Sequence, residues 1–335
     1  MDRSMPSLPN TSVLVTGASG FVGGHLTRTL AERGVQVKAL ARVRERAKYI
    51  DGLDRVEIVL GDLTDADSLR RAVEGCSVVF HVAAATHGPL TAQQAVNADG
   101  TRALAQIAAD AGVQRVVHVS SVAIYGFKNL PERVDEDMPP IPSPYAYTRT
   151  KLAGEHALRE VANARGMEYS IVRPGMIYGP RSGLWTAQVF RLAAAPVTVF
   201  LGSGEGYAIP IHVDDVCSLL IACAEHPAAA GEAFNCAPDP GVPWRAWLSA
   251  YRQLKGPVRW LGIPPLPVRL LAPLIAALSP RDSLGHDFPA VVESYLQRIT
   301  YSTAKAQRLL GWSPQHTLES GVQSCVPYLK RIGRL

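Results

Sequence analysis

The sequence predicts an α/β protein with a doubly wound parallel sheet and a smaller C-terminal domain that is partly interleaved with it. Three observations support this prediction. Short β-branched runs alternate with helical patterns in the N-terminal half, a glycine-rich turn follows the first run, and the alternation fades after Pro174. Apolar strands that alternate with helices form a parallel sheet covered on both faces.

The expected strands are short, mostly apolar runs at residues 12–16, 35–40, 56–60, 78–82, 116–120 and 169–172. The expected helices lie between them, at residues 21–33, 65–74, 98–111 and 147–164. Beyond Pro174 proline and glycine become dense, and a helix at 214–225 and a strand at 233–236 continue the pattern. We therefore place the sheet domain at 10–174 with a return segment near 212–236, and the smaller domain at 175–211 and 237–335.

Composition excludes several classes of protein. The chain has 335 residues, 47% of them hydrophobic and 19% charged, which is typical of a folded protein. Its 34 basic and 29 acidic residues give a net charge of +5, too small an excess to favour a nucleic-acid partner. The five cysteines are scattered and form no C-x-x-C pair, so we expect reduced thiols, no zinc site and a cytoplasmic location. The N-terminal segment lacks the apolar core of a secretion signal.

A glycine-rich loop of the form G-x-x-G-x-x-G joins the first expected strand to the first expected helix. Glycines allow a tight turn and a close approach of the backbone, and a helix N-terminus presents free N–H groups to an anion. In this strand–turn–helix context the loop predicts a Rossmann-type site for a dinucleotide pyrophosphate; the alternative is a purely structural turn. The predicted contacts are Gly17, Ser19, Gly20, Phe21, Val22 and Gly23.

The end of the second expected strand indicates which dinucleotide is bound. An acidic residue about 20 positions beyond the loop would hold the ribose of NAD, but Arg42 and Arg44 occur here instead. Guanidinium groups match a 2′-phosphate, so we predict NADP with Arg42 as a contact and keep NAD as the alternative. Solvated loop arginines would give the same pattern. Asp62 and Leu63, after the third strand, are predicted to face the adenine, and Asp62 is also a candidate helix cap.

Candidate catalytic residues follow the fifth expected strand and occupy a later helix. Ser121 lies at the end of that strand, and Tyr147 and Lys151 stand four residues apart on one face of the helix 147–164. A lysine ammonium one turn away stabilises a tyrosinate and lowers a phenol pKa that starts near about 10. Such a tyrosine can act as a general acid or base, while the serine hydroxyl orients a carbonyl or alcohol.

Alternatives exist for both hydroxyl groups. Ser120 precedes Ser121 and is the rival serine. Tyr145 is the rival tyrosine, but Arg149 stands where a lysine partner would be. Tyr147 could also be a buried packing residue without a chemical role.

These motifs resemble the extended short-chain dehydrogenases/reductases, a group shared by 3β-hydroxysteroid dehydrogenases, dihydroflavonol reductases and nucleotide-sugar epimerases. The resemblance implies that Tyr147 is the acid/base, that Lys151 binds the nicotinamide ribose and that Ser121 aligns the reacting oxygen. The resembling elements, in the order of the family, are TGASGFVG (16–23), GDL (61–63), HVAA (81–84), VNADGT around Asn97, SSVAIYG (120–126), YTRTK (147–151), RPGMIYGP (173–180) and HVDDV (212–216).

The same resemblance implies further contacts and an assembly. Val82, Ala83 and Ala84 would line the cofactor, and Pro174 would lie beside the nicotinamide carboxamide. A homodimer is expected through the helices at 98–111 and 147–164.

Other polar residues receive structural interpretations. We interpret His81 as a strand residue rather than a catalyst. His212 with Asp214 and Asp215 suggests a metal, but the two aspartates begin an expected helix and are interpreted as caps, so no metal is predicted. Asn97 is expected to hydrogen-bond near the active site or a helix start, with a proton relay as the alternative.

The chain departs from the nucleotide-sugar members of the resembled family in two places. Those members usually carry an asparagine shortly after the arginine of the sixth strand and often an Arg-Asp pair before the HVDD element, whereas this chain has RPGM at 173–176 and AIPI at 208–211. We therefore predict an NADP(H)-dependent oxidoreductase that interconverts a secondary alcohol and a ketone on a steroid-like, 3-oxo-acyl or flavonol-like substrate. The alternatives are a nucleotide-sugar epimerase or dehydratase with tightly bound NAD, and a non-catalytic dinucleotide sensor.

The stretch 260–278 is strongly apolar, which favours an apolar substrate. Prolines and Arg269 interrupt it, so it does not predict a membrane-spanning helix. Residues 252–335 hold 11 basic and 4 acidic residues. A basic, apolar segment leads to the hypothesis of contact with a membrane surface, and a substrate lid or a domain-packing helix is the alternative.

Overall fold

The computed structural model describes Leu8 and residues 11–127, 129–141, 143–256, 259–280, 283 and 285–335. Most of the N-terminal segment lies outside these ranges. The expectations that it carries no secretion signal and that the sheet domain begins at residue 10 therefore fall outside the described residues.

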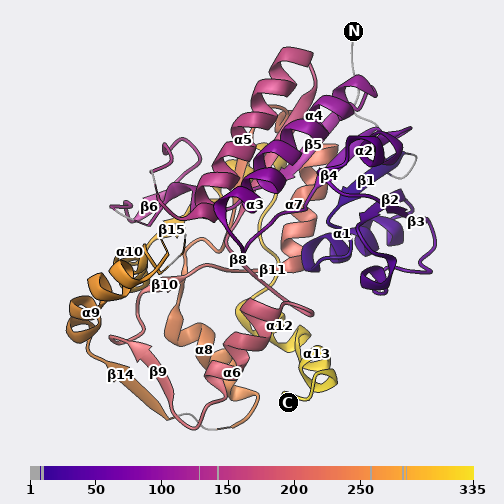
Figure 1. Cartoon of the computed structure of the whole chain (residues 1–335). Helices are drawn as coiled ribbons and strands as arrows, with labels where there is room; N and C mark the ends of the chain where they lie inside the picture. The colour runs from indigo at the N-terminus through magenta and orange to yellow at the C-terminus, as the bar shows by residue number, and fades with distance from the viewer. Residues whose placement is uncertain are drawn as a thin grey trace.

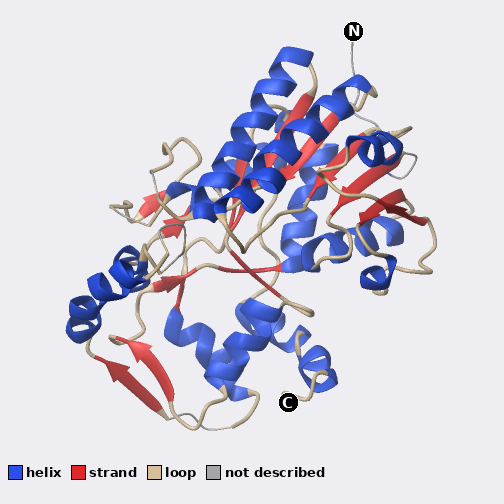
Figure 2. Ribbon diagram, viewed as in Figure 1, coloured by secondary structure: helices blue, strands red, loops and turns tan. Residues whose placement is uncertain are grey.

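A seven-stranded parallel sheet lies between two layers of helices, as Figures 1 and 2 show. Its strand order is β12-β7-β5-β4-β1-β2-β3, so the chain moves outward from β1 in one direction and then returns to continue on the other side. In sheets of this kind ligands bind at the carboxyl ends of the strands, where the order reverses. The strands are β1 (Ser12–Thr16), β2 (Gln36–Ala41), β3 (Val56–Leu60), β4 (Val78–His81), β5 (Arg115–Val119), β7 (Glu168–Pro174) and β12 (Ala233–Cys236).

Each face of the sheet has its own buried cluster. Val13 and Val15 of β1 point to the cluster that includes α1 and α7, while Leu14 points to the cluster that includes α2, α4 and α5. Because both faces are covered, the strands are apolar at nearly every position instead of alternating. The helices are α1 (Phe21–Glu32), α2 (Ala66–Val73), α4 (Gly100–Asp110), α5 (Ala146–Arg165) and α7 (Val213–Glu225).

The predicted fold class and its principal elements are confirmed, with most ends within two residues of the expected positions. The expected strand 233–236 is β12 and pairs in parallel with β7 at the edge of the sheet. The expected helix 98–111 is divided, because a π-helical turn at Ala95–Asp99 precedes α4.

Most of the remaining elements are short, and most of them form the lower part of Figure 1. A third cluster there contains Trp247 and Tyr251, both fully buried. Two-stranded pairs between segments distant in sequence, such as β8 with β11 and β9 with β14, were missed by the sequence analysis. These elements are α3 (Leu90–Gln94), β6 (Arg133–Val134), β8 (Met176–Tyr178), α6 (Val189–Ala193), β9 (Thr198–Leu201), β10 (Tyr207–Ala208), β11 (Pro210–His212), β13 (Val242–Pro243), α8 (Trp244–Gln253), β14 (Trp260–Ile263), α9 (Pro265–Leu278), α10 (Phe288–Leu296), β15 (Thr300–Tyr301), α11 (Ala304–Leu310), α12 (Leu318–Ser324) and α13 (Val326–Arg331).

The apolar stretch 260–278 forms β14 and then the helix α9. Pro265 and Pro267 lie in the first turn of α9, where the backbone N–H groups have no partner within the helix, so proline is tolerated there. Pro273 lies inside the helix. Among the described residues, no helix has the length and apolar character needed to cross a bilayer.

Candidate active site

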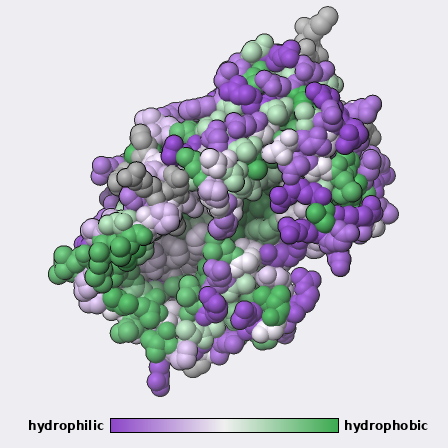
Figure 3. All heavy atoms as spheres, in the orientation of Figure 1, coloured by the Kyte–Doolittle hydropathy of each residue, from purple (hydrophilic) through white to green (hydrophobic). Residues whose placement is uncertain are grey.

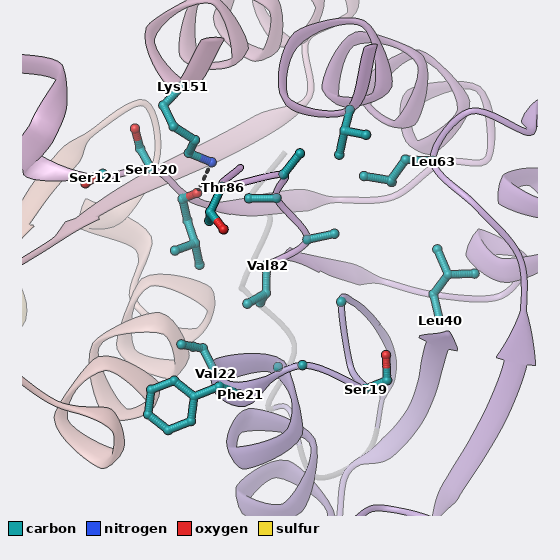
Figure 4. Close-up of a pocket in the computed structure, with 18 of the residues that line it drawn as sticks. Ser19, Phe21, Val22, Leu40, Leu63, Val82, Thr86, Ser120, Ser121 and Lys151 are labelled. Atoms are coloured by element: carbon teal, nitrogen blue, oxygen red, sulfur yellow. Dashed lines mark hydrogen bonds between the residues drawn. The ribbon is translucent and has the colours of Figure 1, made fainter. Parts of the chain in front are cut away.

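A cavity of about 550 Å³ lies at the carboxyl edge of the sheet (Figure 4). Its walls come from the glycine-rich loop, the ends of β2 to β5 and β7, and the first turns of α5. All the residues that the sequence predicted for the site line it: Gly17, Ser19, Gly20, Phe21, Val22, Gly23, Arg42, Asp62, Leu63, Val82, Ala83, Ala84, Ser121, Tyr147, Lys151 and Pro174. The lining residues that the sequence analysis did not single out include Leu40, Thr86, Val96 and Ile177.

The glycine-rich loop packs tightly against the end of β4. Gly17 has a φ of +68°, and a Cβ there would lie 2.8 Å from the Cα of Ala83. A Cβ at Gly23 would collide with the carbonyl oxygen of Gly17, so the loop and the start of α1 could not approach each other as they do. Gly20 caps α1 without a side-chain acceptor, and the first turn holds no acidic residue. The helix N-terminus therefore suits an anion such as the pyrophosphate of a dinucleotide.

A buried hydrogen-bond chain that the sequence analysis missed fixes the ends of β1 and β4. The Thr16 hydroxyl accepts hydrogen bonds from the backbone N–H groups of Val82 (3.1 Å) and Ala83 (3.2 Å). The same hydroxyl lies 2.9 Å from Nδ1 of His81, whose Nε2 lies 2.9 Å from the Thr101 hydroxyl. His81 is thus a buried strand residue with both ring nitrogens bonded. The sequence feature that could have indicated these hydrogen bonds is a polar residue at the end of an otherwise apolar strand.

Acid pH is expected to destabilise the fold through this histidine. Burial, together with the charge of Lys151, lowers the pKa of His81 to about 3. In the unfolded chain the ring binds a proton near pH 6.5, so between the two values the unfolded state holds more protons and stability falls as pH falls. From pH 6.5 to pH 5 this amounts to about 2 kcal/mol.

Denaturant unfolding of the wild type and of His81→Gln at pH 7 and pH 5 checks this expectation. The variant should lose about 2 kcal/mol of the pH dependence. An equal pH dependence in the two proteins would contradict it.

Lys151 and Ser121 come together with Tyr147, but their electrostatics differ from the sequence prediction. Lys151 is buried, and its ammonium donates to the carbonyl of Val119 at 2.6 Å (Figure 4). Burial lowers the pKa of Lys151 to about 8, opposed by the charge of Glu155. Burial also raises the pKa of Tyr147 to about 12, and a hydrogen bond with Ser121 opposes this only in part. The pKa of the Tyr147 phenol is therefore raised and not lowered as predicted, because burial outweighs the hydrogen bond with Ser121.

The structure distinguishes the candidate serine and tyrosine from their rivals Ser120 and Tyr145. The Ser121 hydroxyl accepts a hydrogen bond from the N–H of Ala123 at 3.1 Å. It also forms a hydrogen bond with the Tyr147 phenol. Ser120 also lines the cavity, but its buried hydroxyl has no hydrogen-bond partner in the described part of the chain. The Tyr145 ring lies 6.1 Å from that of Tyr147, and Tyr145 is not part of the cavity wall.

Asn97 lies next to these residues, in the π-helical turn before α4. Its side chain bonds to both backbone groups of Ala85 at 2.8 Å and donates to the Thr150 hydroxyl at 3.0 Å. It thereby joins the cavity wall at Ala85 to α5, one residue before Lys151. The expected hydrogen bonding near the active site is present.

The two arginines near the end of β2 have different surroundings. Arg42 lines the cavity, is 70% exposed, and has its Nε 4.0 Å from a carboxylate oxygen of Asp62. Arg44 pairs with Asp51 at 2.9 Å and is not part of the cavity wall, so one guanidinium and not two faces the site.

The carboxylate of Asp62 stabilises the turn that follows β3. It accepts hydrogen bonds from the N–H and the hydroxyl of Thr64. Burial raises the pKa of Asp62, but these bonds and the charge of Arg42 leave it lowered overall. Asp65, not Asp62, caps α2.

The interpretation of Asp214 and Asp215 as helix caps is wrong. The residue that caps α7 is His212, whose ring nitrogen accepts a hydrogen bond from the N–H of Asp214. Both aspartates lie inside the first turn of the helix. Asp215 instead accepts hydrogen bonds from the backbone of Gln315 and His316 and so anchors a distant loop. Atoms of His212, Asp214 and His316 that could ligate a metal lie within 4.8 Å of one another. Nε2 of His212 is already engaged, because it is hydrogen-bonded to the Ser324 hydroxyl at 2.9 Å. The prediction of no metal stays a prediction.

This strand order, with a glycine-rich loop and a tyrosine–lysine pair at the carboxyl edge, defines a dinucleotide-dependent enzyme of the Rossmann type. Residues 13–237 match the model of the NAD dependent epimerase/dehydratase family, and the chain belongs to that family. It is an NAD(P)-dependent oxidoreductase of the extended short-chain type.

Relatives extend over nearly the whole chain. A 4-hydroxy-2-methyl-3-oxo-4-farnesyl-3,4-dihydroquinoline-1-oxide ketoreductase of Stigmatella aurantiaca is 30% identical over 317 residues, which cover 92% of this chain and 94% of the relative. A 3 beta-hydroxysteroid dehydrogenase/Delta 5→4-isomerase of Mycobacterium tuberculosis is 30% identical, with 94% and 90% covered. The crystal structure of a UDP-glucose 4-epimerase from Thermotoga maritima superimposes with a TM-score of 0.76 at 21% identity, covering 96% of this chain and 99% of the other, which shows a common fold.

Proposed function

We propose that the protein is an NADP(H)-dependent enzyme that interconverts a ketone and a secondary alcohol on a largely apolar substrate. The main support for this proposal is the Tyr147 phenol in the wall of the cavity. This phenol is hydrogen-bonded to Ser121, and burial raises its pKa to about 12. At neutral pH this phenol keeps its proton. Reduction of a ketone needs a proton donor in this protonation state.

The residues fit a balanced reduction. The dinucleotide, when bound, supplies a hydride to the carbonyl carbon. The electron pair of the C=O π bond moves to the oxygen, and Tyr147 gives that oxygen its proton. Ser121 orients the oxygen through its hydroxyl group, and Lys151, mostly charged at neutral pH, stabilises the phenolate left on Tyr147. Solvent then returns a proton to the phenolate.

An apolar substrate is supported by sequence and by relatives. The chain lacks the asparagine and the Arg-Asp pair that accompany nucleotide-sugar binding in the resembled family. Two of the relatives are named for activity on a farnesylated ketone and on a steroid. The Thermotoga epimerase shares the fold, but its name describes activity on a nucleotide sugar.

A spectrophotometric screen tests this proposal. NADPH and NADH oxidation is measured with a 3-ketosteroid, a 3-oxo-acyl ester, a farnesylated ketone and UDP-glucose. We expect many turnovers of NADPH with at least one apolar ketone. Conversion of UDP-glucose without consumption of cofactor would instead establish the epimerase alternative.

Cofactor preference is expected to depend on Arg42. Because its guanidinium is the basic group that faces the cavity at the end of β2, Arg42→Gln should weaken NADPH binding about tenfold, the equivalent of about 1.4 kcal/mol, and leave NADH binding unchanged. Fluorescence titration of both cofactors measures this. Arg44→Gln is the matched control and should change neither affinity, because Arg44 pairs with Asp51. Equal losses for NADPH and NADH in Arg42→Gln would refute the NADP assignment.

The homodimer and the cytoplasmic location remain predictions. The two helices expected at the dimer interface, α4 and α5, pack side by side on one face of the sheet. Arg102 of α4 bridges to Glu160 of α5 at 2.8 Å, and this ion pair links the exposed sides of the two helices.

A further inference from the structure

The helix α9 exposes its apolar side chains instead of burying them. Of its residues, all of which are described, only Ala272 is buried. Six large apolar side chains are between 40% and 80% exposed: Leu266, Leu270, Leu271, Leu274, Ile275 and Leu278. A helix at the surface of a globular protein normally turns such residues toward the core.

The neighbouring ribbon extends this surface. Strands β9 and β14 pair in parallel, and Val199, Leu261 and Ile263 on them are between 39% and 54% exposed. Figure 3 shows hydrophobic residues gathered over α9, β9 and β14 at the lower left, while much of the rest of this view is hydrophilic. We call the exposed apolar side chains of α9, β9 and β14 the apolar face. Contiguous apolar surfaces of this kind mark sites of contact with proteins or membranes.

The charged residues within and next to α9 and β14 are mostly basic. Residues 254–280 contain no acidic residue but include Lys255, Arg259 and Arg269. Lys255 and Arg259 are exposed beside β14, whereas Arg269 is paired with Glu293 of α10 at 2.7 Å. A second copy of the chain docked through the same face would bring like charges together. An anionic lipid surface complements both the cations and the apolar side chains.

We propose that the apolar face docks onto the surface of an anionic lipid membrane, with α9 lying in the plane of the headgroups. The 14 residues of α9 span about 21 Å, less than the hydrocarbon core of a bilayer, so the helix lies on the membrane and does not cross it. Docking is independent of the proposed reaction. Where both hold, an apolar ketone reaches the cavity from the bilayer in which it dissolves.

Co-sedimentation of the full chain with vesicles tests the proposal. We expect binding to vesicles of phosphatidylcholine mixed with phosphatidylglycerol, with weaker binding to phosphatidylcholine alone and at high salt. The double variant Leu270→Gln/Leu274→Gln should lower the partition coefficient at least about tenfold. Lys255→Gln/Arg259→Gln should remove most of the salt dependence.

Leu60→Gln/Ile332→Gln is the matched control, because it replaces two exposed apolar residues outside the apolar face. It should bind vesicles as the wild type does. The substituted positions of all three variants are exposed, so the thermal unfolding of each variant should match that of the wild type.

Three results would overturn the proposal. The first is an absence of vesicle binding by the wild type, and the second is vesicle binding that Leu270→Gln/Leu274→Gln leaves unchanged. The third is light scattering in which Leu270→Gln/Leu274→Gln converts a dimer to a monomer while no vesicles are bound, since a second copy would then cover the face. None of these results bears on NADPH oxidation in solution, so failure of docking and failure of the proposed reaction are distinguishable.

Discussion

Replacing Tyr147 by phenylalanine is expected to slow ketone reduction by about two to four orders of magnitude while NADPH still binds. The substitution removes the phenol oxygen, which carries the proton, and keeps the ring that forms part of the cavity wall. Steady-state NADPH oxidation with the best substrate of the screen measures the loss. Titration of cofactor fluorescence measures binding, which should stay close to that of the wild type.

Tyr145→Phe is the matched control for this prediction. Tyr145 lies two residues away, and its ring is 6.1 Å from that of Tyr147, but it is not part of the cavity wall. Its variant should keep wild-type turnover. If Tyr147→Phe retained full activity, or if Tyr145→Phe lost as much, Tyr147 would not be the proton donor.

The second large effect concerns stability, and it comes from a buried ion pair behind the site. Arg173 of β7 contacts both carboxylate oxygens of Glu155 of α5, at 3.0 and 2.7 Å, and donates to the Tyr125 hydroxyl at 2.8 Å. The side chains of Arg173 and Glu155 are only 7% and 1% exposed. Glu155→Ala leaves the guanidinium buried without its carboxylate. We expect the free energy of unfolding to fall by about 3–5 kcal/mol, measured by denaturant titration.

Glu160→Ala provides the comparison on the same helix. Glu160 pairs with Arg102 at 2.8 Å, but its side chain is 67% exposed and its charge is screened by solvent, so its loss should lower the free energy of unfolding far less than the loss of Glu155. A Glu155→Ala variant as stable as Glu160→Ala would show that the buried pair does not hold β7 to α5.

Features coded by neighbouring residues were predictable from the sequence. The glycine-rich loop needs a strand before it and a helix after it, and Tyr147 and Lys151 share a face because one helical turn separates them. Such local patterns identified the sheet strands and the residues that line the cavity. They also located β12, a short and mostly apolar run like the earlier strands.

Features that depend on distant partners were not predictable. Arg44 turns to Asp51 and leaves Arg42 alone at the site, and Lys151 bonds to the Val119 carbonyl, a contact between α5 and β5. The pairing of β8 with β11 joins three-residue segments that are far too short to show a period. The pKa of Tyr147 depends on how deeply the chain buries it, and no spacing of residues encodes that.

The apolar stretch 260–278 shows the same limit. Its composition favours an apolar ligand, a lid or a membrane contact equally well. Only the packing of α9, which buries Ala272 and exposes its leucines, distinguishes a surface from a core helix.

Transfer of deuterium from C4-deuterated NADPH to the product tests the central claim most directly. The two C4 positions of the nicotinamide are labelled in separate preparations, and the alcohol formed from the apolar ketone is analysed by mass spectrometry. The account predicts that one of the two preparations places one deuterium on the carbinol carbon for each NADPH consumed. Alcohol without deuterium from either preparation, or a cofactor that stays bound and unconsumed during turnover, would contradict it.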